Sequence, residues 1–288
     1  MRTLPMSAAA IIACCSLLPA QQVPRAIFTD PPRDSAHPAR MEVLHIPSGD
    51  VKINGVAYVA SGAGMHPTFV FFHGLPGNEK NLDLAQAVRR AGWNAVTVNY
   101  RGSWGSPGRF SFGGNLEDAD AVLAYLRDPL HARTFGIDTT RLVIAGHSMG
   151  GWVTVLTAAH DHRLAGAILI SAADMGRRSD MKRADVVASM ADNMEGLAGV
   201  TAESMADEVL ASGAKLRFAG AVPGLARIPL LVLSSDDGLA PGTDTLVKAV
   251  RAEGNTRVTT VHKATDHSWS DKRIALESAV VNWLARLR

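Results

Sequence analysis

One serine of the chain stands in a setting that could make it a nucleophile. Ser148 is the centre of Gly146-His147-Ser148-Met149-Gly150, which follows an apolar run and precedes a helix-compatible run. A strand, a sharp turn and a helix in this order hold the central hydroxyl at the tip of the turn. Gly146 and Gly150 lack a Cβ, so the strand and the helix can pass close beside each other. The spacing therefore predicts covalent chemistry at Ser148.

A serine hydroxyl is a weak nucleophile near neutral pH, so it needs a base, and the base needs an acid to orient it. His267 lies on a loop after the strand-like residues 257–261 and before the last helix-like run, which suits a base. His262 is the alternative base. Two consecutive aspartates, Asp236 and Asp237, lie on the loop that leaves the strand-like residues 230–233. The residues themselves leave both open as the acid.

The remaining histidines and the charge balance argue against other functions. We interpret His147, inside the turn, as a structural residue. No two histidines have metal-ligand spacing on a convincing helix, so we expect no metal site, and the serine chemistry requires no cofactor. The net charge is +2 and no dense basic patch is interleaved with aromatic residues, which makes nucleic acid a poor candidate partner.

Short apolar runs alternate with helical patterns along most of the chain. Because the runs are apolar throughout, we expect strands that are covered on both faces, and the alternation predicts a mostly parallel, doubly wound α/β sheet. A chain of 288 residues, 47% of them hydrophobic, can build a large core for such a fold. The expected strands are 41–46, 51–60, 68–72, 95–99, 142–145, 167–170, 230–233 and 257–261. The expected helices are 82–90, 116–126 with an N-cap at Asn115, 245–252 and 274–287.

One segment interrupts this alternation. Residues 175–227 fall between two expected strands and are too many for a single crossover. They contain two Ala- and Met-rich helical patterns, at 181–190 and 201–211. We interpret the segment as a small helical cap over the ends of the strands, and the alternative is a helical decoration that does not contact substrate.

The N-terminus has the pattern of an export signal. One positive charge precedes a short apolar core in residues 1–20, which are too few to span a membrane, and cleavage after Ala20 is expected. The alternatives are a buried helix and a lipid anchor at Cys14. Both cysteines lie in this leader, so the mature chain would have none, and the protein is predicted to be exported to the periplasm or secreted. Residues 21–40 predict an irregular arm, followed by the main domain at 41–288. No apolar run after the leader is long enough to cross a bilayer.

The chain resembles the α/β-hydrolase superfamily from about residue 51 onward. It is similar to the branch of dienelactone hydrolases and prolyl oligopeptidases, and to bacterial esterases. The stretches that carry this resemblance are Phe72-His73-Gly74-Leu75-Pro76-Gly77, Asn99-Tyr100-Arg101-Gly102, residues 146–151, residues 237–241 and Asp266-His267. In this family the acid lies four residues before a proline, which here is Pro241. The resemblance therefore implies a triad of Ser148, His267 and Asp237.

The resemblance also implies an oxyanion hole. The tetrahedral intermediate of acyl transfer carries a negative oxygen, and two backbone N–H groups aimed at it would each contribute on the order of 3 kcal/mol. The family pattern implies the N–H groups of Leu75 and Met149 as these donors. Trp104, Phe110 and Trp269 lie on loops near the expected site and are candidate substrate contacts, although packing would explain each of them as well.

The sequence favours a serine hydrolase that cleaves carboxylic esters through an acyl-enzyme. The first alternative is a serine peptidase that acts on small peptides, although no acidic pair that could hold a peptide terminus stands out. The second alternative is a non-catalytic binding protein on the same fold. The expected partner is therefore a small ester or a short peptide.

Overall fold

The computed structural model describes residues 23–287. The predicted signal peptide and the alternative lipid anchor at Cys14 lie outside the described residues. The N-terminal arm contains one short 3-10 helix, Arg25–Ile27, and its Ile27 carbonyl accepts a hydrogen bond from Arg90 Nη2 at 3.0 Å. The arm therefore runs against the first helix of the main domain.

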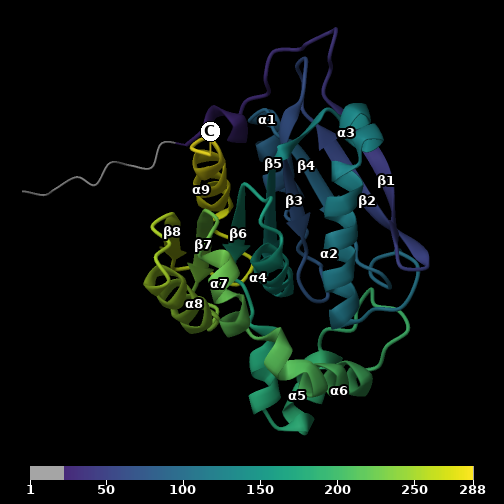
Figure 1. Ribbon diagram of the computed structural model, residues 1–288, viewed down its shortest axis with the longest axis vertical. Coiled ribbons are helices and arrows are strands. Elements are labelled where there is room, and N and C mark those ends of the chain that lie inside the picture. Colours follow the sequence, from purple (N-terminus) through teal and green to yellow (C-terminus); the bar gives the residue numbers. More distant parts are fainter. Residues whose placement is uncertain (1–22, 288) are drawn as a thin grey trace, which may run out of the picture.

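An eight-stranded sheet forms the centre of the molecule (Figure 1). Its strand order is β1-β2-β4-β3-β5-β6-β7-β8, and only the β1–β2 and β2–β4 pairs are antiparallel. The mostly parallel, doubly wound sheet predicted from the sequence is confirmed. The strands are β1 (Arg40–Ser48), β2 (Val51–Val59), β3 (His66–Phe72), β4 (Asn94–Val98), β5 (Ile137–His147), β6 (Gly166–Ile170), β7 (Leu230–Ser235) and β8 (Val258–Lys263).

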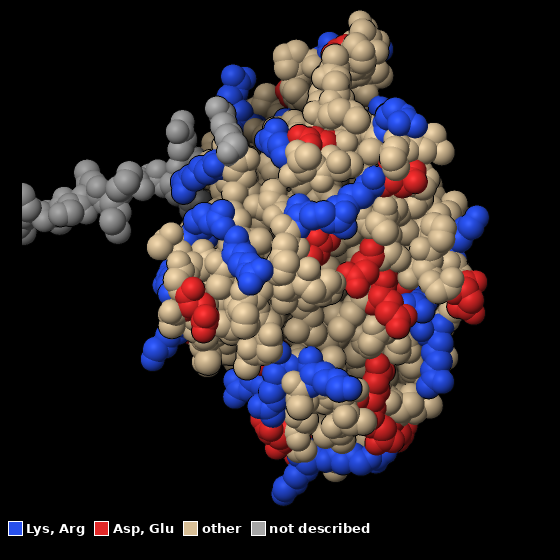
Figure 2. Space-filling model, viewed as in Figure 1, with Lys and Arg blue, Asp and Glu red and all other residues tan. Residues whose placement is uncertain are grey.

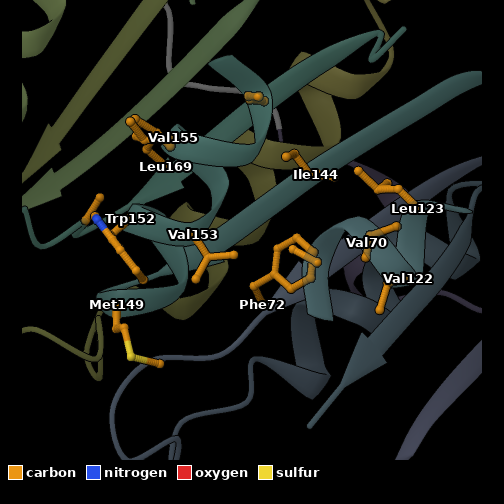
Figure 3. Packing of buried hydrophobic residues seen from close by; sticks show 14 of the residues in the cluster. Val70, Phe72, Val122, Leu123, Ile144, Met149, Trp152, Val153, Val155 and Leu169 are labelled. Atoms are coloured by element: carbon orange, nitrogen blue, oxygen red, sulfur yellow. The ribbon is translucent and has the colours of Figure 1, made fainter. Parts of the chain in front are cut away.

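Helices cover both faces of this sheet, as the apolar strands require. Two separate clusters of buried residues fill the two interfaces, one with α2, α4 and α8 and the other with α1 and α9. Figure 3 shows the first cluster, in which Phe72, Ile144 and Val153 meet between the sheet and α4. The helices of the main domain are α1 (Leu82–Arg90), α2 (Phe112–Arg127), α3 (Pro129–Phe135), α4 (Met149–His160), α8 (Ala240–Ala252) and α9 (Arg273–Leu284).

The start of α2 differs from the sequence prediction. The N-cap is Ser111, whose side chain accepts a hydrogen bond from the N–H of Gly114 at 3.0 Å, and Asn115 is buried inside the helix. The predicted cap at Asn115 is therefore wrong, because the glycines of the first turn hid the real start. Asp118, in the same helix, is fully buried and accepts a hydrogen bond from Arg101 Nε at 2.7 Å.

Two other helices also differ from the sequence prediction. The short helix α3 has no counterpart among the predicted elements, and α8 begins at Ala240, five residues before the predicted start. In both helices a proline occupies the first turn, where its missing N–H costs nothing. The first turn is the position in a helix that favours proline.

The segment between β6 and β7 forms a helical cap. It contains the 3-10 helices η2 (Met175–Asp180), η3 (Gly213–Leu216) and η4 (Phe218–Ala221), and the α-helices α5 (Arg183–Ala191), α6 (Ala202–Ser212) and α7 (Val222–Leu225). Figure 1 shows α5 and α6 beyond one end of the sheet. Between them, Ala198 donates its N–H to Gly102 O at 2.8 Å and accepts the N–H of Phe110 at 3.0 Å. The cap is therefore fastened to the loop between β4 and α2.

Candidate active site

The turn between β5 and α4 holds Ser148 in an unusual backbone conformation. Its φ is 56° and its ψ is −119°, in a region that residues other than glycine rarely occupy. The carbonyl of Ser148 accepts the N–H groups of Gly151 and Ala173, both at 3.0 Å. Such strain persists only where the surroundings fix it, and it is typical of functional turns. The turn presents a half-buried serine at the carboxyl end of the central strand.

The two glycines of the turn allow a very close approach of backbone to backbone. A Cβ on Gly146 would overlap the carbonyl of Gly150, and a Cβ on Gly150 would overlap the carbonyl of Phe72. Neither obstacle is a flexible side chain that could move aside. The first turn of α4 can therefore lie directly against β5 and β3 only because these residues are glycines, which was the reason given for them from the sequence.

Asp237 and His267 lie in direct contact although 30 residues separate them. The Nδ1–H of His267 donates to Asp237 Oδ2 at 2.7 Å, and the side chains are 3% exposed for the aspartate and 40% for the histidine. Since Nδ1 carries the proton in this bond, Nε2 of a neutral His267 has a lone pair that can accept another proton. This is the arrangement that a general base requires.

The carboxylate of Asp237 is held in its charged form. Burial alone would raise its pKa, but hydrogen bonds from His267, from the Leu239 N–H at 2.9 Å and from Ser171 lower the pKa to about 2. An aspartate with such a low pKa remains ionised throughout the neutral range. It can therefore orient the imidazole and stabilise the imidazolium that forms during proton transfer.

The neighbouring aspartate forms a second pair with the other candidate base. His262 Nε2 donates to Asp236 Oδ1 at 3.0 Å, and His262 Nδ1 accepts the hydroxyl of Ser234 at 3.0 Å. Both ring nitrogens are thus occupied, and the side chains of this pair are 52% and 62% exposed. The geometry favours Asp237 and His267 over Asp236 and His262 for acid–base chemistry.

His147 connects the nucleophile turn to the His267 loop. Its Nε2–H donates to the carbonyl of His267 at 2.8 Å, and the centres of the two rings are 4.5 Å apart. Burial and the nearby charge of His267 lower the pKa of His147 to about 4, so it remains a neutral donor. The residue before Ser148 therefore anchors the loop of the base, as its structural interpretation anticipated.

The Ser148 hydroxyl itself makes no hydrogen bond to the ring of His267 among residues 23–287. The structure thus brings Asp237 and His267 together and places the loop of His267 against the turn of Ser148. Catalytic hydrogen bonds are often long before substrate binds and tighten only in the complex.

The loop after β3 lies beside Ser148. A Cβ built on Gly74 would be 3.0 Å from Ser148 Cβ, so the backbone of this loop passes directly over the serine. Leu75 follows as a half-buried residue, while Met149 is the buried first residue of α4. The N–H groups in the first turn of a helix have no partner within that helix, which leaves them available to an anion.

His73 fixes the shape of this loop. Its Nδ1–H donates to Gly74 O at 2.8 Å, and its Nε2 accepts the hydroxyl of Ser103 at 3.3 Å. Burial lowers the pKa of His73 to about 4, which keeps the ring neutral and suited to both bonds. The hydroxyl of Tyr100 also donates to the carbonyl of His73 at 3.3 Å. Tyr100 belongs to a stretch that carries the family resemblance, but the sequence assigned no role to it or to Ser103.

Two of the three aromatic candidates for substrate contact are fully buried, and the third, Trp104, lies beside the loop after β3. Phe110 and Trp269 have no exposed surface and pack in the two clusters on opposite faces of the sheet. A substrate contact by either side chain therefore has no support in this arrangement. Trp104 is half-buried, donates its Nε1–H to Pro76 O at 2.7 Å and lies under the ammonium of Lys80, which is 4.8 Å from the ring centre.

Trp269 instead supports the acid. Its Nε1–H donates to Ser171 Oγ at 3.1 Å, and Ser171 in turn contacts both Ser235 Oγ at 2.9 Å and the carboxylate of Asp237. Ser171 is buried, with a φ of 43°. Nothing in the sequence marked Ser171 apart from its position directly after an apolar strand, where polar side chains reach the functional edge of a parallel sheet.

Arg273 links the loop of His267 to the loop that lies beside Ser148. Its guanidinium donates to the carbonyl of Ser268 at 3.0 Å, to Asn81 Oδ1 at 2.9 Å and to Asp83 Oδ2 at 2.8 Å. Ser268 follows His267 directly, and Asn81 precedes α1. A single side chain therefore fixes two chain segments that are separated by about two thirds of the sequence.

The part of the chain that the structure describes shows neither a metal site nor a membrane-spanning helix. Residues 23–287 contain no group of three or more His, Cys, Asp or Glu side chains arranged to hold a metal ion. Over these residues no helix combines the length and the apolar character that a membrane crossing needs.

A doubly wound sheet with a strained serine at the end of its central strand, and an Asp–His pair on the following loops, defines a protein of the α/β-hydrolase class. The comparison with family models agrees, because residues 69–279 match the model described as the alpha/beta hydrolase family. The chain belongs to this family.

Two curated relatives are similar over part of the chain. The quorum-quenching protein AidA of Acinetobacter baumannii is 34% identical over 127 residues, which are 42% of this chain and 40% of that protein. The alpha/beta hydrolase domain-containing protein WAV2 of Arabidopsis thaliana is 36% identical over 106 residues, which are 36% of this chain and 33% of that protein. The match thus spans well under half of these relatives.

Solved structures are similar over most of this chain. A lipase in its open form superimposes with a TM-score of 0.67 and 14% identity, covering 86% of this chain and 99% of the lipase. The acylaminoacyl peptidase of Pyrococcus horikoshii gives a TM-score of 0.65 and 16% identity, covering 86% of this chain and 42% of the peptidase. At such low identity these likenesses show the fold alone.

Proposed function

We propose that this α/β hydrolase cleaves carboxylic esters through an acyl-enzyme on Ser148. The observation that carries the proposal is the 2.7 Å bond between the buried Asp237 carboxylate and His267, on a loop that packs against the nucleophile turn. In this mechanism Nε2 of His267 takes the proton of the serine hydroxyl as its oxygen attacks the acyl carbon. The same proton then passes to the leaving alcohol, and water repeats the sequence to release the acid.

The developing oxyanion is the second requirement of this mechanism. We propose that it is held by the backbone N–H groups of Leu75 and Met149, from the loop that passes over Ser148 and from the first turn of α4. Rigid donors aimed at the developing charge typically lower the barrier by about 3 kcal/mol each. The neutral, buried His73 supports this role because it fixes the loop on which Leu75 lies.

The test compares Ser148→Ala with Ser212→Ala, a control at the end of α6, on p-nitrophenyl esters of increasing chain length and on aminoacyl p-nitroanilides. We expect ester hydrolysis by the wild type and the control, and a loss of about 10⁴-fold or more in kcat for Ser148→Ala. A preference for the anilides would favour the peptidase alternative. If the wild type hydrolyses neither substrate class, a non-catalytic binding protein would be favoured. An unchanged rate in Ser148→Ala would remove this serine from the mechanism.

A further inference from the structure

A hollow opens between the cap and the start of α8. Its volume is about 430 Å³, and its wall includes Ala173, Arg178, Met181, Gly238 and Leu239. A second hollow of about 640 Å³ shares Asp174, Arg177 and Gly242 with it and continues between α8 and the segment of η4 and α7. The two hollows thus form one groove along the junction of the cap and the main domain.

The inner wall of the first hollow is built from residues that bind the catalytic groups. The N–H of Ala173 donates to the carbonyl of Ser148 at 3.0 Å, and the N–H of Leu239 donates to Asp237 Oδ1 at 2.9 Å. Gly238 directly follows Asp237. A molecule in this hollow would therefore touch the same backbone segments that hold Ser148 and Asp237 in place.

Among residues 23–287, two arginines of the cap, Arg183 and Arg217, are paired with an aspartate, whereas Arg178 is not. Arg183 binds Asp207 through two hydrogen bonds, of 2.7 and 3.0 Å, and Arg217 forms an ion pair with Asp180. Arg178 has no ion pair within the described part of the chain, and its guanidinium donates only to Met175 Sδ, at 3.2 Å. Burial lowers the pKa of Arg178, which reports the cost of keeping this cation away from water.

The other charged groups of the hollow leave a positive excess. Arg177 lies on its wall beside Arg178, while the charge of Asp180 is balanced by Arg217. Asp174 is the remaining acid, and it accepts the N–H of Gly176 at 3.2 Å. Burial raises the pKa of Asp174, while the charges of Arg177 and Arg217 act in the opposite direction. In Figure 2, Lys and Arg side chains gather at the lower left, where α5 and α8 of Figure 1 approach each other.

We propose that this hollow binds a carboxylate of the substrate, held by Arg178 with Arg177 beside it. The inference rests on the ester hydrolysis proposed above and specifies its substrate class as esters that carry a second, free carboxylate. A guanidinium presents parallel N–H donors that match a carboxylate, and a partly buried cation without an acidic partner gains most from an incoming anion. The ester group would lie at Ser148 and the free acid in the hollow.

The experiment uses two matched substrates, mono-p-nitrophenyl glutarate and its methyl ester, which have the same acyl chain but differ by one charge. The quantity measured is the ratio of kcat/KM for the charged ester to that for the neutral ester. We expect Arg178→Gln to lower this ratio by about 10- to 100-fold, the usual effect of losing a charged hydrogen bond. Arg178→Lys should restore part of it, and Arg183→Gln, at the exposed pair of the cap, should leave it unchanged.

A binding measurement separates this inference from the proposed function. Glutarate should raise the unfolding temperature of the wild type and of Arg183→Gln, but not that of Arg178→Gln. If neither ester is cleaved, the proposed function fails, while stabilisation by glutarate that depends on Arg178 still supports an anion site. An unchanged charged-to-neutral ratio in Arg178→Gln, or equal stabilisation by glutarate in both variants, overturns the inference even when ester hydrolysis is established.

Discussion

Two consecutive aspartates, each bonded to a histidine, make two pairs of very different kinds in this molecule. Asp237 is 3% exposed and binds His267 at 2.7 Å, whereas Asp236 is 62% exposed and binds His262 at 3.0 Å. Both contacts are hydrogen bonds between an aspartate and a histidine, so pairing alone does not distinguish the two pairs. An exposed pair of this kind contributes little, because water and salt screen it.

The difference lies in what surrounds each pair. The carboxylate of Asp237 accepts further hydrogen bonds from Leu239 and Ser171, and among residues 23–287 the ring of His267 is hydrogen-bonded only through Nδ1. His262, in contrast, uses both of its ring nitrogens. A base must keep one nitrogen for its substrate, so the buried pair is poised for proton transfer and the exposed pair is already satisfied.

The histidines offer the largest contrast. We expect His267→Ala to lower kcat by about 10⁴-fold, because the hydroxyl of Ser148 would lose its base. His262→Ala should change kcat by less than about twofold, since this ring lies on the surface. Steady-state kinetics on a p-nitrophenyl ester measures both, and equal losses in the two variants would refute the distinction between the pairs.

The aspartates should differ less, but in the same direction. Asp237→Asn removes the charge that stabilises the imidazolium, and we expect kcat to fall by about 10²- to 10⁴-fold. Asp236→Asn should remain within about twofold of the wild type. The reverse order would move the acid to Asp236 and would leave the geometry of the buried pair without a function.

Arg273 gives the buried pair a support that can be removed separately. Its bond to Ser268 holds the loop of His267, so we expect Arg273→Gln to lower kcat by roughly 10-fold through misplacement of the base. KM should change little, and Arg273→Lys should recover part of the rate. Lys272→Gln, at the exposed neighbour, is the control. A loss of thermal stability with unchanged kcat would show that Arg273 only holds the fold.

The smallest expected effect is on the free energy of unfolding and concerns Glu277, which interacts with Asp83 and Arg273. Burial, the charge of Asp83 and a hydrogen bond with it raise the pKa of Glu277 to about 7. A carboxyl with a raised pKa stabilises the folded state fully below its unfolded pKa of about 4.5. This stabilisation is lost as pH rises through its folded pKa of about 7. The free energy of unfolding of Glu277→Gln should therefore equal that of the wild type at about pH 5. At about pH 8 it should be higher, by at most about 3 kcal/mol.

Thermal unfolding at the two pH values measures this difference, with Glu253→Gln, at the exposed residue that follows α8, as the control. If Glu277→Gln differs from the wild type by the same amount at both pH values, Glu277 does not titrate in this range.

The sheet was largely predictable because its strands are apolar on both faces, a pattern that is local in the sequence. The nucleophile turn was predictable for a similar reason, since the glycines around Ser148 are required by contacts within a few residues of it. The start of α2 was missed because Gly113 and Gly114 resemble a loop, although Ser111 caps them as helix.

The surroundings of the site depend on contacts between distant segments, which no local pattern reveals. Trp269 lies two residues after His267 and was therefore expected at the substrate, but its ring fills the core and its indole nitrogen supports Ser171. Arg273 and His147 reach the site from other segments, and their roles depend on where loops meet. Spacing along the chain and the family resemblance predicted the reacting groups, but neither could predict the residues that hold them.

The most direct test of the central claim is covalent labelling with a fluorophosphonate, followed by mass spectrometry of the digested protein. The account predicts one adduct, on Ser148, forming at least about 100-fold more slowly in His267→Ala than in the wild type and at the wild-type rate in His262→Ala. An adduct on another residue, or equally fast labelling of Ser148 in His267→Ala, would contradict it.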